Sequence, residues 1–217
     1  MKAMMTEADL NRIKEAVATA EKQTSGEIVP YIVPQSASHE VAVWRGAGLF
    51  ALLAYTVVLG TRWFSGWGGS QLTEGIVPVL LIITAAAIGA ALVHWVPAVK
   101  RRFAGQVRLA LATHRRAMQA FVEKEVFSTR ERTGILLFVS LLEHRIEVVG
   151  DAGINAKVDT DDWIEVVTTI QQHIKAGQLA EGLVQGIHQC GHLLEKAGVA
   201  IRSDDTNELA DDVSFGV

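Results

Sequence analysis

Four aspartates and two glycines lie close together in the segment VVGDAGINAKVDTDDW, residues 148–163. The aspartates are Asp151, Asp159, Asp161 and Asp162. Hard divalent cations such as Ca²⁺ bind several carboxylate oxygens that converge from a loop, and glycines let the chain turn tightly around the ion. These four residues are therefore candidate metal ligands, although their spacing does not match an EF-hand loop.

Helix capping is the alternative interpretation of three of these aspartates. Residues 159–162 precede a predicted helix that begins near Trp163, and carboxylates are favoured at the N-cap and in the first turn of a helix. Capping does not account for Asp151, which follows a predicted strand. The residues themselves leave both interpretations open.

The stretch IHQCGHLLEK offers two further candidates for chemistry, both of which we set aside. Cys190 is followed six residues later by Lys196, whereas a cysteine-dependent phosphatase needs an arginine there and a loop rather than a helix. His188 and His192 have a spacing that suits zinc on a helix. Gln189 replaces the glutamate of a zincin motif, so we interpret the two histidines as surface residues.

The first forty residues predict one helix and one strand. In the segment TEADLNRIKEAVATAEKQTSG, Thr6 and Asp9 are spaced as a helix N-cap and its partner. The next segment, EIVPYIV, predicts a strand, and Pro30 within it is typical of a sheet edge or a bulge. Because forty residues are too few for a core, we expect this strand to pair with strands later in the chain.

The second half of the chain predicts the rest of an α/β sandwich with a small mixed sheet. A helix is expected over residues 106–126 and is followed by the apolar strand TGILLFVSL and by the alternating strand RIEVV. Two amphipathic helices come next. Their apolar faces are Trp163, Val166, Val167, Ile170 and Ile174, and then Leu179, Leu183, Ile187 and Leu194.

Two long apolar segments interrupt this sandwich. Residues 46–61 and 75–99 contain no charged residue, and about 20 apolar residues suffice to cross a bilayer. We therefore predict a two-helix transmembrane hairpin with spans at about residues 44–67 and 75–99. Tryptophans lie near the ends of the spans, as in interfacial anchors: Trp44, Trp63, Trp67 and Trp95.

Basic residues predict the orientation of the hairpin. Six of them follow the second span, whereas the linker between the spans has only Arg62 and Glu74. The six are Lys100, Arg101, Arg102, Arg108, Arg115 and Arg116. The positive-inside rule places both long flanks in the cytoplasm. We expect a multi-pass protein of the bacterial inner membrane, with the lipid bilayer and other membrane proteins as partners.

Small residues spaced four apart mark one side of the second span. They are Ala85 and Gly89, Ala86 and Ala90, and Ala87 and Ala91. Such residues allow helices to approach closely, so they favour packing of the two spans as a hairpin. The same face could also pair two copies of the chain as a homo-oligomer.

Composition limits the classes of protein to consider. The chain has 217 residues and a formal net charge of −4, which argues against nucleic acid as a partner. Its single cysteine excludes an internal disulfide. We divide it into a first part of the soluble domain at 1–40, the hairpin at 41–99, the remainder of the domain at 100–202 and an acidic flexible tail at 203–217.

Three segments together resemble the TPM domain family, in particular its bacterial branch. They are TSGEIVPYIV, STRERTGILLFVSLLEHRIEVVGDAGI and GQLAEGLVQGIHQCGHLL. The match includes a D-x-G-I motif after the second strand and a tryptophan that opens the next helix. The tail sequence NELAD differs only at Ala210 from the NELPD that is common in this branch. The resemblance covers nearly all of the soluble portion.

The resemblance implies a three-layer α/β/α fold and several functions. Members of the family include a thylakoid protein of photosystem II repair with acid phosphatase activity and an auxiliary factor for an acetylcholine receptor. Some members bind calcium in loops at one end of the sheet, and Asp151 and the 159–162 cluster are the matching positions here. We expect an accessory module for membrane proteins that lacks a catalytic set. The alternative is a weak metal-dependent phosphatase that uses these aspartates.

Overall fold

The computed structural model describes residues 5–64, 74–201, 204 and 206–216. They form two compact units. The first combines Met1–Ala37 with Ala110–Val217, and the second is Ser38–Leu109. The first unit is therefore made from two segments that are far apart in the sequence.

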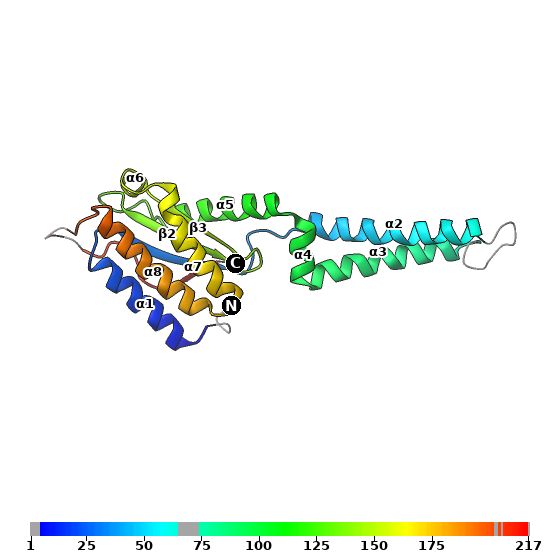
Figure 1. Cartoon of the computed structure of the whole chain (residues 1–217), viewed down its shortest axis with the longest axis horizontal. Helices are drawn as coiled ribbons and strands as arrows, with labels where there is room; N and C mark the ends of the chain where they lie inside the picture. The colour runs from blue at the N-terminus through cyan, green and yellow to red at the C-terminus, as the bar shows by residue number, and fades with distance from the viewer. Residues whose placement is uncertain (1–4, 65–73, 202–203, 205, 217) are drawn as a thin grey trace. The chain divides into compact units, whose positions relative to one another are not determined.

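A small mixed sheet forms the centre of the first unit (Figure 1). Its strands are β1 (Glu27–Val33), β2 (Gly134–Ser140), β3 (Arg145–Gly150) and β4 (Ser214–Phe215), in the order β3-β2-β1-β4. The strand β1 is parallel to β2 and β4, whereas β2 and β3 are antiparallel. The prediction of an α/β fold with a small mixed sheet is confirmed.

Pro30 lies in β1 at a place where no partner strand needs its missing N–H. The carbonyl of Ile32 accepts a hydrogen bond from the Gly216 N–H, so the backbone groups of alternate residues, including Pro30, face the same edge as β4. However, β4 pairs only with Tyr31 and Ile32. The strand β1 lies between β2 and β4 rather than at the edge of the sheet, but Pro30 faces a part of β1 that β4 leaves open.

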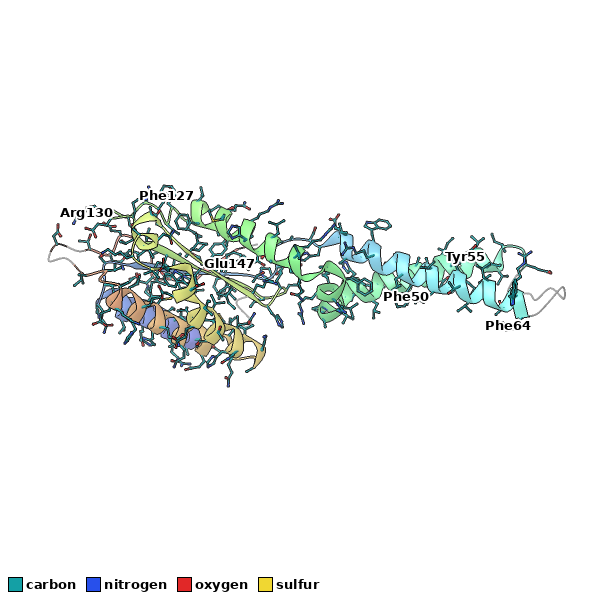
Figure 2. All side chains as sticks on the ribbon, turned by 45° about the horizontal axis from the view of Figure 1, so that its top comes forward. Phe50, Tyr55, Phe64, Phe127, Arg130 and Glu147 are labelled. Atoms are coloured by element: carbon teal, nitrogen blue, oxygen red, sulfur yellow. The ribbon has the colours of Figure 1, made fainter. Side chains whose placement is uncertain are left out.

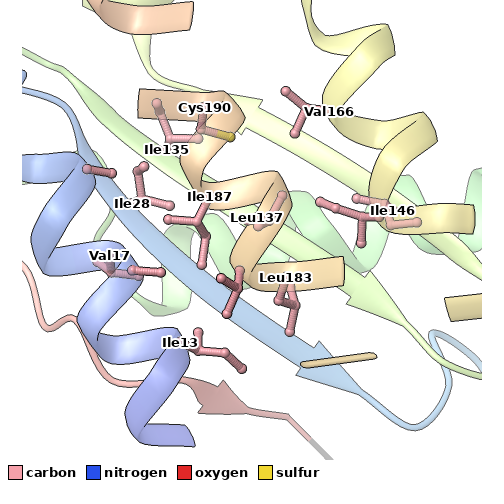
Figure 3. Packing of buried hydrophobic residues seen from close by; sticks show 14 of the residues in the cluster. Ile13, Val17, Ile28, Ile135, Leu137, Ile146, Val166, Leu183, Ile187 and Cys190 are labelled. Carbon is pink, nitrogen blue, oxygen red and sulfur yellow. The ribbon is translucent and has the colours of Figure 1, made fainter. Parts of the chain in front are cut away.

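Helices cover both faces of the sheet. On one face lie α1 (Glu7–Glu21), α7 (Trp163–Lys175) and α8 (Leu179–Lys196), and their buried side chains meet those of β1, β2 and β3 (Figure 3). On the other face lies α5 (Gln106–Glu123), through Ala117, Ala120 and Phe121. The fold has three layers, with the capping box of Thr6 and Asp9 present at the start of α1.

The C-terminal segment differs from the predicted flexible tail. The backbone N–H groups of Glu208 and Leu209 donate to the Glu27 carboxylate, at 3.1 and 3.3 Å. Further on, β4 adds a short parallel strand to β1. The segment has few large apolar residues, but Leu209, Val213 and Phe215 pack against the hydrophobic clusters and backbone N–H groups donate to distant acceptors, and composition does not reveal such contacts.

The second unit is a helical hairpin made of α2 (Glu40–Phe64), α3 (Val77–Trp95) and the short α4 (Pro97–Ala104). Gly89 lies against α2 so closely that a Cβ atom there would be 2.6 Å from the Gly46 carbonyl oxygen. The small-residue face of α3 is thus used within the hairpin, as predicted for the packing of the spans. Pairing of two copies through this face stays a prediction.

The hairpin helices are long and apolar enough to cross a membrane by length and composition, and only 11% of the most apolar window of each is buried inside the structure. The side chains of α2 stand out from it, and Tyr55 and Phe64 are 48% and 90% exposed (Figure 2). The helix α3 ends at Trp95 because Val96 precedes Pro97 and is extended. Trp67 and the end of the first predicted span lie outside the described residues.

Candidate functional site

Asp151 is part of a salt bridge at the end of β3. Its side chain is 5% exposed, and Arg132 donates to both oxygens, from Nε to Oδ2 at 2.6 Å and from Nη2 to Oδ1 at 2.9 Å. Oδ1 also accepts the backbone N–H of Ala152 at 2.7 Å, which caps the short helix α6 (Ala152–Asn155). The hydrogen bonds and charge of Asp151 raise the pKa of Arg132, so the guanidinium stays charged.

The D-x-G motif positions this salt bridge. A Cβ atom at Gly153 would lie 2.3 Å from the Glu131 carbonyl oxygen, so only glycine allows α6 to approach the loop before β2. The Gly153 N–H donates to the carbonyl of Arg132, which adopts a left-handed conformation with φ of 59°. The salt bridge between Asp151 and Arg132 therefore links the loop before β2 to the segment after β3, at one end of the sheet.

The other three aspartates lie on the turn that leads into α7. Thr160–Asp162 form one turn of 3₁₀ helix, and α7 begins at the next residue. The Asp162 Oδ2 atom accepts the backbone N–H of Asp159 at 2.9 Å, which is the reciprocal contact of a capping interaction. Asp159 and Asp161 are exposed. For Asp162 the structure thus shows the role that the capping interpretation assigns to this cluster.

The structure does not gather the four aspartates around one point. Within the described ranges, no three side chains of His, Cys, Asp or Glu come together in a way that would hold a metal ion. Asp161 and Asp162 instead line a shallow groove of 550 Å³ between α7 and α8, together with Glu165, Gln172 and Lys196. Metal binding by Asp151, Asp159, Asp161 and Asp162 stays a prediction.

The cysteine and histidine candidates lie on α8. Cys190 is fully buried among apolar residues, and burial raises the pKa of its thiol to about 12. The thiolate required of a nucleophile is therefore suppressed at neutral pH. His188 and His192 are exposed, as expected for surface residues.

Two neighbouring glutamates, Glu21 at the end of α1 and Glu27 at the start of β1, form a site that sequence reasoning missed. Glu27 is 6% exposed and binds the backbone of the C-terminal segment, while the Glu21 Oε1 atom accepts the Ile28 N–H at 2.9 Å. Burial raises the pKa of Glu21 to about 8, and the nearby charges of Glu27 and Asp211 add to the effect. The detectable sequence feature is a charged residue at the first position of the apolar strand EIVPYIV.

Comparisons with known proteins identify a domain within the chain. The family model described as the TPM domain matches residues 98–193, which confirms the resemblance found in the sequence. The matched range does not include β1, although β1 lies beside β2 in the sheet. No curated protein matches the chain.

One solved structure shares the fold. It is the NMR structure of BA42 protein from the psychrophilic bacterium Bizionia argentinensis, with a TM-score of 0.58 and 21% sequence identity. The alignment covers 98% of this chain and 95% of that one. At this identity the likeness concerns the fold alone.

Proposed function

We propose that this protein, which carries a TPM domain at residues 98–193, is a membrane-anchored accessory module that binds other membrane proteins and assists or regulates them. We place it in the bacterial inner membrane, with its N- and C-terminal parts in the cytoplasm. The observation that carries the proposal is the apolar surface that α2 and α3 leave uncovered.

Large apolar side chains are exposed along the full length of both helices. Among them are Leu49, Leu52, Leu53, Val57, Leu59, Val79, Leu80, Ile83, Ile88 and Leu92. Apolar surface of this extent is unfavourable in water and favours a hydrocarbon environment. Trp44 and Trp95 are about three-quarters exposed near one end of the hairpin and Trp63 is 84% exposed near the other, which supports aromatic belts at two interfaces.

The charges at the ends of the hairpin favour the cytoplasmic placement of both flanks. Lys100, Arg101 and Arg102 lie on α4, directly after the second span, and Arg45 lies near the start of α2. The Arg45 guanidinium donates to the Phe103 carbonyl at 2.9 Å, which fixes a charge at this end. The positive-inside rule assigns such an end to the cytoplasm.

A binding role agrees with the way the carboxylates of Asp151 and Asp162 are used. Both oxygens of Asp151 are occupied by Arg132 and the backbone, and Asp162 caps a turn. The alternative function is a weak metal-dependent phosphatase that uses Asp151 and the 159–162 cluster. It would require a cation to recruit the exposed carboxylates of the groove between α7 and α8.

Cysteine labelling tests the membrane topology. In spheroplasts, we expect Glu74→Cys to react with a membrane-impermeant maleimide, and Ile164→Cys to react only after permeabilisation. Both positions are exposed, and the native Cys190 is fully buried, so the background is low. Labelling of Ile164→Cys in intact spheroplasts would contradict the cytoplasmic placement, and release of the protein by alkaline carbonate would contradict the anchor.

A second experiment separates the module from the phosphatase. A photo-crosslinking amino acid at Ile83, which is 59% exposed on α3, should give adducts of discrete mass with membrane proteins. Phosphate-ester hydrolysis is measured in parallel with Ca²⁺ or Mg²⁺. The phosphatase predicts turnover that falls at least about 100-fold in Asp161→Asn and is unchanged in the exposed control Glu15→Gln. Turnover with these properties, together with an absence of protein adducts, would favour the phosphatase over the accessory module.

A further inference from the structure

The helix α5 has two functional faces. Its inner face covers the sheet through Ala117, Ala120 and Phe121, all of which are buried. Its outer face carries Leu111, Met118 and Val122, which are 47%, 44% and 60% exposed. Three large apolar side chains on one exposed helical face need an explanation, because a single sheet-covering helix normally turns polar residues outward.

Arginines alternate with these apolar residues. Arg108, Leu111, Arg115, Met118 and Val122 recur every three or four residues, so they form one stripe along α5, and all are exposed. We call this set the outer stripe. No acidic residue occurs in the sequence from Gln106 to Val122.

The charged groups around the outer stripe have partners of their own. Glu123 accepts hydrogen bonds from Arg116 and Gln119, at 3.0 and 2.8 Å, and Arg116 also donates to the Tyr31 hydroxyl at 2.8 Å. Glu147 on β3 lies 3.6 Å from the His114 ring. Glu123 is thus held by hydrogen bonds and Glu147 lies beside His114, whereas the stripe itself is apolar and basic.

We propose that the outer stripe is a docking surface for anionic lipid headgroups. Leu111, Met118 and Val122 enter the boundary between headgroups and acyl chains, and Arg108 and Arg115 bind lipid phosphates. Helices that lie in a membrane interface combine large apolar side chains with Lys and Arg, and the exposed part of α5 carries both kinds of residue. The alternative occupant is a protein partner with acidic side chains opposite the arginines. The outer stripe has no feature that would recognise a particular protein, so we assign it to lipid.

This inference rests on the proposed membrane anchor, which also makes it energetically reasonable. Three apolar side chains and two arginines would hold a free protein to a vesicle only weakly. Leu111 follows Trp95, the last residue of α3, by only sixteen residues. Even a fully extended connection of that length reaches only about 55 Å. The outer stripe thus stays at high local concentration near the bilayer, so a weak affinity suffices.

Depth-dependent quenching tests the proposal on the full-length protein in vesicles. Met118→Cys carries an environment-sensitive fluorophore, and Ile164→Cys on α7 is the matched control, since it is exposed and lies on the opposite face of the sheet. The vesicles contain phosphatidylcholine with or without phosphatidylglycerol, and lipids with a nitroxide near the headgroup act as quenchers. The protein-to-lipid ratio is kept low, so that copies of the protein do not contact one another.

We expect a blue shift and quenching at Met118 in anionic vesicles, and neither at Ile164. The double variant Arg108→Gln, Arg115→Gln should shift the docking equilibrium about 30-fold toward the undocked state, and salt should act in the same direction. Equal behaviour of the two probes in protein that resists carbonate extraction would overturn the lipid docking alone. Extraction by carbonate would overturn the anchor and the docking together. If the fluorophore at position 118 were shielded from water in native membranes but not in pure lipid vesicles, the outer stripe would be assigned to a protein partner instead.

Discussion

Replacement of Glu21 by glutamine should stabilise the α/β unit at high pH and leave it almost unchanged at low pH. Glu21 ends α1, is half-buried, and accepts the Ile28 N–H through Oε1. Glutamine keeps this acceptor and the size of the side chain but carries no charge. The substitution therefore isolates the cost of ionising the carboxyl group at this position.

The direction follows from the pKa of Glu21, which burial raises from 4.5 to about 8. Between these values the folded state retains a proton that the unfolded state has lost, so stability falls as pH rises through this window and stays lower above it. A shift of this size corresponds to roughly 5 kcal/mol at full burial. Water reaches part of the side chain, so we expect about 2–4 kcal/mol.

Thermal unfolding of the full-length protein in a non-ionic detergent, followed by circular dichroism at pH 5 and pH 9, measures the effect. At pH 5 the two proteins should melt within a few degrees of each other, whereas at pH 9 the variant should melt roughly 10 °C higher. Glu15→Gln, an exposed change on the same helix, should give the same small shift at both pH values. An advantage of Glu21→Gln that does not grow between pH 5 and pH 9 would refute the reasoning.

Three further substitutions test packing and ion pairing. Gly89→Ile should separate α2 from α3 at a cost of about 1–3 kcal/mol or more, and faster proteolysis in detergent would reveal this. Ala87→Ile, at an exposed position of the same helix, should leave the rate of proteolysis unchanged. Arg132→Met should lower the melting temperature because it leaves the buried Asp151 without its guanidinium, and adding Asp151→Asn should recover part of the loss; a further decrease would contradict the salt bridge. Glu27→Ala removes the acceptor of two backbone N–H groups and should speed hydrogen exchange in the segment after residue 206, because each hydrogen bond to a charged group contributes about 1.5–3 kcal/mol. Unchanged exchange there would show that the other contacts of the segment, such as β4 and the Lys14–Asp212 ion pair, are sufficient to hold it.

Local patterns were sufficient to predict most elements of the fold. The capping spacing of Thr6 and Asp9 marks the start of α1, and EIVPYIV coincides with β1. The apolar run TGILLFVSL contains β2, whose seven residues are all buried between two helical layers. These features depend on neighbours in sequence, which is why periodicity and turn residues reveal them.

Features that depend on distant partners were not predictable in this way. Nothing near Asp151 in the sequence indicates that Arg132, nineteen residues earlier, occupies both of its oxygens. The order of the C-terminal segment depends on Glu27, which is 181 residues away from Glu208. The segment has the composition of a mobile one, because its hydrogen bonds and its few apolar contacts are made with partners far away in the sequence.

The split of the first unit across the hairpin has a consequence for synthesis of the protein. The parallel partner of β1 begins at Gly134, about a hundred residues after β1 ends at Val33. At about 5–20 residues per second, a ribosome makes that intervening stretch in roughly 5–20 s. During this interval α1 and β1 have no sheet to join, while the apolar segments of the hairpin are emerging. The order of events on the ribosome is thus fixed: under the proposed topology, insertion into the bilayer precedes closure of the sheet. If only one of the two spans inserted, the two halves of the sheet would lie on opposite sides of the bilayer and could not pair.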